Sequence, residues 1–288
     1  MTWITNPGLA LSSLMATIES NLTANGWTLT DRSADGVFDA VNNQGVHQYV
    51  QITNCQSGGT AADSTHNMYL QLQAWLSWNT GTHAGASGSG TTYNRIYYAA
   101  SNVADTTTVD LYMSVTANRF IIYIQGVGNY RHWGYFGGLD SLAGTNDPFS
   151  ALLITSHGPI STSAWGAFLL PSSGGASYWP AAFFYYLALA SLSALGILAA
   201  NVVSQQQLGS DASQMMLFPI LVGDSAAPNF RGNLDGIVCC PLGNGALAHL
   251  DTVSQGSTTY MVVQPGGIPV NGIPLTGSYN LGLALAEV

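Results

Sequence analysis

Lysine is absent from this chain of 288 residues, and charge of either sign is scarce. Charged residues make up 7% of the chain, against about 25% in an average globular protein. The five basic residues are all arginines, and fourteen acidic residues bring the formal net charge to −9. Five scattered arginines on an acidic chain cannot neutralise a run of phosphates, so we expect no nucleic-acid partner. Without lysine, the chain has no side chain for Schiff-base or P-loop chemistry.

Cysteine is also rare, and its pattern indicates no disulfide framework or metal site. The three cysteines, Cys55, Cys239 and Cys240, form an odd set in a long chain. Neither a CxxC spacing nor a clustered histidine accompanies the adjacent pair, which we expect to be two small buried residues of a strand. We therefore expect no metal and no cofactor. The opening residues MTWITNPG lack the basic and apolar regions of a signal peptide, so none is expected.

Apolar residues make up 47% of the chain, which is enough to form a sizeable core. With so little charge, the surface must consist of Ser, Thr, Asn, Gln and Gly. Such side chains lose less conformational entropy in a contact than Lys or Glu do. The composition predicts either a chain whose surface is covered by neighbouring subunits or a rigid β structure that stands in the open.

A long charge-free region covers residues 148–210, which contain no Asp, Glu, Lys or Arg. Within it, residues 180–203 are long and apolar enough to cross a membrane. No Lys or Arg flanks them to set an orientation, so we expect an element buried at a subunit interface, with membrane contact as the alternative. The expected interface anchors are Trp165, Trp179, Phe183, Phe184, Tyr185, Leu187, Leu192 and Leu195.

Apolar periodicity predicts one helix followed by many strands. Residues 6–25 carry Leu11, Leu14, Ile18 and Leu22 on one stripe, and Asn6 with Pro7 suits the start of a helix. Residues 79–92 are rich in Gly, Ser and Thr and predict an exposed flexible loop. The predicted strands are residues 27–30, 36–41, 46–53, 68–75, 109–115, 119–127, 130–136, 216–222, 236–240, 258–264 and 281–288.

These elements predict a mainly β (α+β) fold with antiparallel, β-sandwich-like sheets, an N-terminal amphipathic helix and a long apolar insertion. Residues 1–147 are expected to hold the helix and an antiparallel β domain. Residues 148–227 are the uncharged apolar insertion, and residues 228–288 supply strands that complete the β domain.

No catalytic constellation is visible in the sequence, and we do not expect an enzyme. The nucleophile-elbow pattern GxSxG is absent, and the aspartates stand mostly in turn contexts, where they bond their own backbone. One aromatic segment carries a binding hypothesis: Tyr130, Arg131, His132 and Trp133 together resemble a glycan subsite of aromatic platform, cation and imidazole. The alternative is a strand with Arg131 solvated and Trp133 in the core.

The order of several short motifs carries a family resemblance. NLTANGWTLTDR is followed by VHQYVQIT, MYLQLQAW and TANRFIIYIQGVGNYRHWGYFGGLD, and later by FRGNLDGIVCCP. In this order the motifs resemble structural proteins of tailed bacteriophages, over roughly residues 8–145 and 228–265. The resemblance implies a non-enzymatic virion component that is assembled in the bacterial cytoplasm. The chain departs from that family in residues 165–203, where a long apolar segment replaces a short polar one.

Composition and resemblance together lead to one functional expectation and several alternatives. The expected function is a virion structural protein of the tail, baseplate or neck, present as a homo-oligomer in a symmetric assembly. Its partners are copies of itself and other virion proteins. The alternatives are a host-surface glycan-binding module, a capsid decoration protein and a polysaccharide-cleaving enzyme that uses Asp140 or Asp147.

Overall fold

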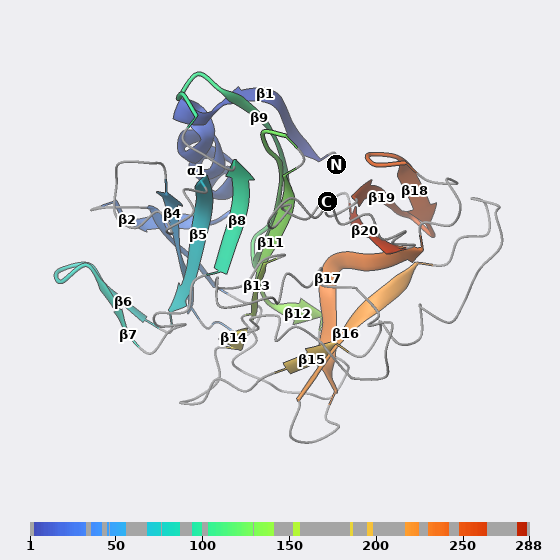
Figure 1. Ribbon diagram of the computed structural model, residues 1–288. Helices are drawn as coiled ribbons and strands as arrows, with labels where there is room; N and C mark the ends of the chain where they lie inside the picture. The colour runs from blue at the N-terminus through green and yellow to red at the C-terminus, as the bar shows by residue number, and fades with distance from the viewer. Residues whose placement is uncertain are drawn as a thin grey trace, which may run out of the picture.

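The computed structural model describes a mainly β protein with antiparallel sheets and one short α-helix, as the sequence predicts. Three sheets lie side by side as layers (Figure 1). The described residues are 3–32, 36–41, 45, 47–55, 68–75, 77–86, 94–99, 103–128, 130–140, 152–155, 185–186, 195–197, 217–224, 230–241, 248–263 and 281–286.

The central layer has the strand order β1-β9-β10-β11-β13-β14, and each described pairing is antiparallel. Its middle strands contain apolar runs such as FIIYI rather than a clean alternation, which is typical of a sheet buried on both faces. Its strands are β1 (Ile4–Ala10), β9 (Thr108–Thr116), β10 (Arg119–Gln125), β11 (Arg131–Gly137), β13 (Leu152–Thr155) and β14 (Tyr185–Tyr186).

One face of the central layer contributes to the main core, which it shares with the helix and the second layer. Phe120 and Phe136 from this face join Leu14 and Ile18 of the helix and Phe38 of the second layer. The second layer has the order β2-β3-β4-β5-β8. Its strands are β2 (Thr28–Asp31), β3 (Gly36–Val41), β4 (His47–Cys55), β5 (Met68–Trp75) and β8 (Asn94–Ala99).

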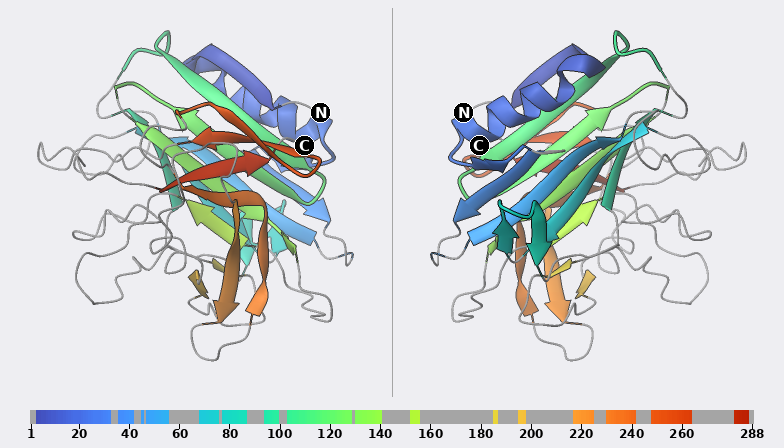
Figure 2. Two further views of the ribbon diagram at one scale, coloured as in Figure 1. Left: turned by 90° about the vertical axis from the view of Figure 1, so that its right-hand side faces the viewer. Right: turned by 90° about the vertical axis from the view of Figure 1, so that its left-hand side faces the viewer.

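The third layer packs on the opposite face of the central sheet, where Tyr123, Trp133 and Tyr135 are buried. It has the order β15-β16-β17-β20-β19-β18, and β12 also pairs with β17. Figure 2 shows its strands crossing in front of the central sheet in the left-hand view. The strands are β12 (Leu139–Asp140), β15 (Leu195–Ile197), β16 (Phe218–Asp224), β17 (Phe230–Pro241), β18 (Thr252–Gln255), β19 (Thr258–Val263) and β20 (Leu281–Ala286).

The prediction of a helix over residues 6–25 is wrong for its first part and correct for its second part. The α-helix α1 covers Leu14–Ala24, after the short 3₁₀ helix η1 (Leu11–Ser13), whereas the segment before them is strand β1. The predicted cap residues lie in a β-bulge instead, where Gly8 has φ +64° and donates its N–H to Asp110 Oδ1 at 2.8 Å. Pairing with β9 outweighs the helical start signal, while Leu14, Ile18 and Leu22 form the buried stripe as predicted.

The predicted loop over residues 79–92 is wrong in its first part. Strands β6 (Ser77–Asn79) and β7 (Ala84–Ala86) form a two-stranded hairpin, and the remainder of that range lies outside the described residues. Gly85 permits this hairpin to fold, because a Cβ there would lie 2.0 Å from the Trp75 ring. The hairpin therefore packs its backbone directly on an indole face. It faces the viewer in the right-hand view of Figure 2.

The described ends of the predicted apolar insertion belong to the sheets. β13 extends the central layer, and β16 pairs with β17 of the third layer. Cys240 lies buried in β17, in a small core with Leu217, Val262 and Ala284. Burial raises the pKa of its thiol to about 11, so the thiol stays protonated and behaves as a small apolar group.

Candidate functional site

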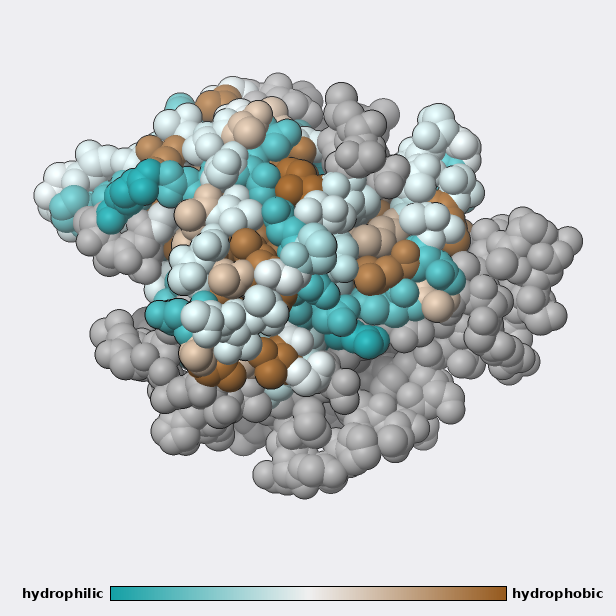
Figure 3. Space-filling model, turned by 90° about the horizontal axis from the view of Figure 1, so that it is seen from above, coloured by the Kyte–Doolittle hydropathy of each residue, from teal (hydrophilic) through white to brown (hydrophobic). Residues whose placement is uncertain are grey.

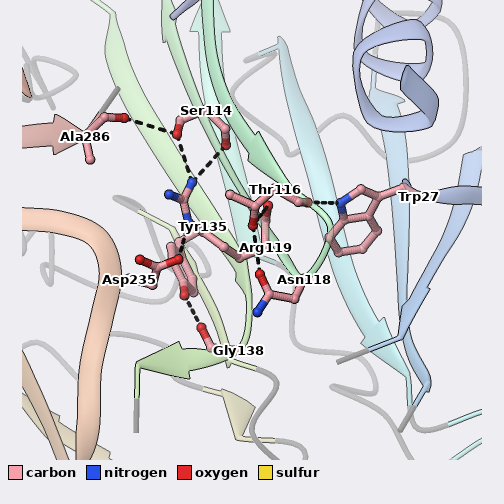
Figure 4. A network of polar contacts seen from close by, with 9 residues as sticks. All are labelled: Trp27, Ser114, Thr116, Asn118, Arg119, Tyr135, Gly138, Asp235 and Ala286. Carbon is pink, nitrogen blue, oxygen red and sulfur yellow. Dashed lines mark hydrogen bonds and ion pairs between the residues drawn. The ribbon is translucent and has the colours of Figure 1, made fainter. Parts of the chain in front are cut away.

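The most connected polar site of the described chain joins the central sheet to the third layer, around Arg119 (Figure 4). Arg119 is the first residue of β10, and 3% of its surface is exposed. Its Nε donates to Asp235 Oδ2 of β17 at 2.8 Å. Its Nη1 donates to Ser114 Oγ at 2.8 Å, and that hydroxyl donates to the Ala286 carbonyl of β20 at 3.2 Å. One buried cation therefore links four strands from two layers.

Two glycines make room for this arginine. Gly137 has φ +139°, and a Cβ there would lie 2.4 Å from the Arg119 backbone. Gly236 has φ +74°, and a Cβ there would lie 2.5 Å from the guanidinium Nη2. Both positions therefore need glycine for conformation and for space. The guanidinium therefore packs closely against Gly236 of β17, next to its partner Asp235.

A second joint connects the same two layers through His249. The ring Nε2 lies 3.1 Å from the Tyr123 hydroxyl and 3.0 Å from Gln125 Oε1, both on β10. Burial, together with the nearby Arg131 charge, lowers the pKa of His249 to about 4. Burial also raises the pKa of Tyr123 well above its usual range. Both groups are therefore neutral around pH 7, and this joint is a neutral hydrogen-bonded contact.

A buried cluster of polar and aromatic residues connects β5 and β8 of the second layer with β11 of the central layer. The Arg95 guanidinium lies 4.3 Å from the centre of the Tyr69 ring and donates from Nη1 to the Tyr97 hydroxyl at 3.1 Å. The His132 ring lies 5.8 Å from that of Tyr97 and 6.1 Å from that of Tyr130. Burial raises the pKa of Tyr69 well above its usual range, although Arg95 opposes the shift. The aromatic faces help to stabilise a buried cation, which is a structural rather than a catalytic role.

Two side chains of the β6–β7 hairpin bind one carboxylate of β2, an edge strand of the second layer. Trp78 Nε1 of the hairpin donates to Asp31 Oδ2 of β2 at 2.8 Å, and His83 Nδ1 lies 2.8 Å from the same oxygen. His83 has φ +51°, a conformation that non-glycine residues rarely adopt. Asp31 lies on β2, the edge strand that β3 and β4 separate from β5. The hairpin, which follows β5 in the chain, therefore crosses the sheet to bind it.

The structure buries three of the four residues of the glycan hypothesis. Trp133 has no exposed surface, and His132 and Tyr130 expose 3% and 5%. Arg131 alone of the four is partly exposed. The segment falls where the central sheet is covered on both faces, which matches the alternative of a core strand.

The predicted interface anchors lie mostly outside the described residues. This holds for Trp165, Trp179, Phe183, Phe184, Leu187 and Leu192. Tyr185 lies in β14, opposite Leu153 of β13, and Leu195 lies in β15, opposite Asp224 of β16. The sequence reasoning missed the pair of Arg119 and Asp235, although both stand in motifs that it quoted, TANRF and FRGNLDG. The signal in the sequence that could have indicated this pair was an arginine at the start of a strand, in a chain with very few charges.

Among the described residues, no three His, Cys, Asp or Glu side chains are grouped so as to hold a metal ion. Within the same residues, no helix has the length and hydropathy needed to cross a bilayer. No model of a known protein family matches the chain, and no curated protein matches it.

Proposed function

We propose that the chain is a non-enzymatic structural component of a bacteriophage virion, in the tail, baseplate or neck. The proposal combines the motif order described above with the physical character of the molecule. Its role is mechanical: a layered β framework presents neutral faces to copies of itself and to neighbouring virion proteins. The charge pattern carries the proposal.

Three of the five arginines make contacts with other side chains of the molecule. Arg119 binds Asp235, Arg95 is buried against Tyr69, and Arg32 binds Glu19. On the face that Figure 3 shows, the described residues are mostly teal and white, with brown side chains in scattered groups. A neutral polar surface loses little side-chain entropy in repeated contacts, which suits a subunit of a symmetric assembly.

The described residues expose little large apolar surface, and this narrows where an apolar contact can lie. Val41, at 47% exposure, is the exposed large hydrophobic residue among them. The predicted apolar anchors instead belong to residues 148–227, from Trp165 to Leu195. In this proposal, residues 148–227 supply the apolar contact and the layered sheets supply the rigid support.

Immunogold electron microscopy tests the proposal directly. Antibodies against the purified chain are applied to phage particles prepared from cells that carry its gene. We expect label at one fixed place on the particle, at the tail or the neck. Label spread over the capsid would support a decoration protein instead, and particles free of label would contradict the proposal.

A further inference from the structure

Within the part of the chain that the structure describes, no strand pairs with the outer edge of β18 in the third layer, and the residues of β18 carry no charge. β18 is the last strand in the order of its sheet, and among the described strands it pairs with β19 alone. Thr252, Ser254 and Gln255 are exposed, and Val253 is half-buried. Figure 1 shows β18 at the outer border of the third layer. An open, regular edge of this kind is a template for pairing with another strand.

The edges at β1, β2 and β8 are less suited to pairing with another strand. β1 has Pro7, which lacks an N–H, and a bulge in which Gly8 bonds to Asp110. β2 is interrupted by a register shift next to Asp31. β8 is already bonded at its open side, because the Val127 N–H donates to the Tyr98 carbonyl at 2.8 Å.

The hydrogen-bond pattern of the β18–β19 hairpin shows which groups of β18 face outward. The Val262 N–H donates to the Asp251 carbonyl at 2.8 Å, so residue 251 directs its backbone toward β19. In an antiparallel pair the direction alternates along the strand. Val253 and Gln255 therefore also bond inward, and Thr252 and Ser254 direct their N–H and C=O groups to the open side.

We propose that the open edge of β18 pairs antiparallel with β18 of a second copy of this chain, about a two-fold axis at Val253. In this register Thr252 stands opposite Ser254 of the other copy, which gives about four backbone hydrogen bonds across the axis. Asp251 stands opposite Gln255, so no like charges oppose each other. The occupant is a second copy because the edge is complementary to itself in both hydrogen bonding and charge.

The pairing is weak by itself, because each backbone hydrogen bond adds little net free energy. It becomes effective when other contacts hold the copies close together. The inference rests on the geometry of the edge alone and holds whether or not the chain belongs to a virion.

Disulfide trapping of Val253→Cys tests the proposed axis. Non-hydrogen-bonded neighbours in an antiparallel pair lie close enough to form a disulfide. At high protein concentration under mild oxidation, we expect the V253C protein to form covalent dimers about tenfold faster than Ser257→Cys, in the exposed hairpin turn. The wild-type chain gives the background from its own thiols, of which Cys55 and Cys240 are buried. Equal rates for the two variants would overturn the proposal.

A second substitution in the V253C background tests the backbone bonding. Ser254→Pro removes an outward N–H without touching the bonds to β19, and Ser254→Ala keeps that N–H. We expect the proline variant to link as slowly as S257C and the alanine variant to link as fast as V253C alone. Where proline lowers the melting temperature, Ser254→Lys replaces it, since a charge at an open edge also opposes pairing. Unchanged linkage in both the proline and the lysine variants would overturn the proposal.

Discussion

Arg119 and Asp235, which are 116 residues apart in the sequence, form the ion pair that joins the central sheet to the third layer, with 2.8 Å between Nε and Oδ2. The two partners differ in environment: the side chain of Arg119 is 4% exposed and that of Asp235 is 45% exposed. The arginine depends on this contact for its charge balance, whereas water can hydrate the aspartate. Because of this difference, we expect substitutions of the two partners to change the free energy of unfolding by different amounts.

Asp235→Ala is expected to destabilise the protein more than Arg119→Met does. The first leaves a buried cation without its partner, which costs about 3 kcal/mol. The second removes the buried charge and fills its space with an apolar chain, while Asp235 turns to water. Urea unfolding of both variants and of the double variant measures the difference. An Arg119→Met variant that is less stable than Asp235→Ala would contradict this account of the joint.

Gly236→Ala is expected to be far more harmful than Gly256→Ala, although both glycines have positive φ. The angles are +74° and +61°, so the conformational cost is about 1 kcal/mol at each position. Only at Gly236 would the new Cβ lie 2.5 Å from Arg119 Nη2, whereas nothing lies within 4 Å of it at Gly256. The difference between the two unfolding free energies therefore isolates the guanidinium contact. Equal costs would show that the arginine does not pack against β17.

Acidification is expected to weaken the His249 joint. Its pKa is lowered to about 4 in the folded protein, against about 6.5 when unfolded. Between these values the unfolded chain binds more protons, so stability falls as the pH drops from about 6.5 to about 4 and then levels off. Because the ring is only partly buried, the loss is about 1–2 kcal/mol.

His249→Gln is the matched control for this pH dependence. Glutamine keeps a hydrogen-bonding group near Tyr123 and Gln125 but does not titrate. The free energy of unfolding, measured from pH 7 to pH 4, should fall less steeply in this variant than in the wild type. Parallel curves would show that His249 does not carry the dependence.

The paired substitution Phe184→Ala with Tyr185→Ala is expected to block incorporation into particles and to leave the sheets folded. Both residues belong to the predicted apolar anchors, and Tyr185 is in the two-residue strand β14 at the border of the central layer. Circular dichroism of the purified variant checks the fold, and complementation of a phage that lacks the gene checks assembly. Normal incorporation of a folded variant would count against the anchor role.

The sequence predicted the strands well where the local pattern and the tertiary structure agree. The strand over residues 36–41 and the alternating strand over residues 68–75 coincide with β3 and β5. The start of the helix failed because Asn6 and Pro7 fit a helix N-terminus and an edge-strand bulge equally well locally. Only pairing with β9, about a hundred residues away, decides between the two.

The layering and the candidate site could not be predicted for a similar reason. Apolar runs such as that of β10 indicate burial on both faces, but they do not say which sheet covers each face. The Arg119–Asp235 pair depends on a contact over 116 residues, and nothing local to Arg119 identifies its partner. The burial of Trp133 follows from the third layer covering its face, and the sequence of β11 alone permits either exposure or burial.

The central claim is that a chain with so little charge exists as a packed subunit among copies and partners. Quantitative mass spectrometry of purified particles from cells that carry the gene tests it most directly. The account predicts the chain in the particle fraction at a fixed number of copies per particle, with little left free in the lysate. Recovery of the chain only as a free monomer in the lysate, with none in the particles, would contradict it.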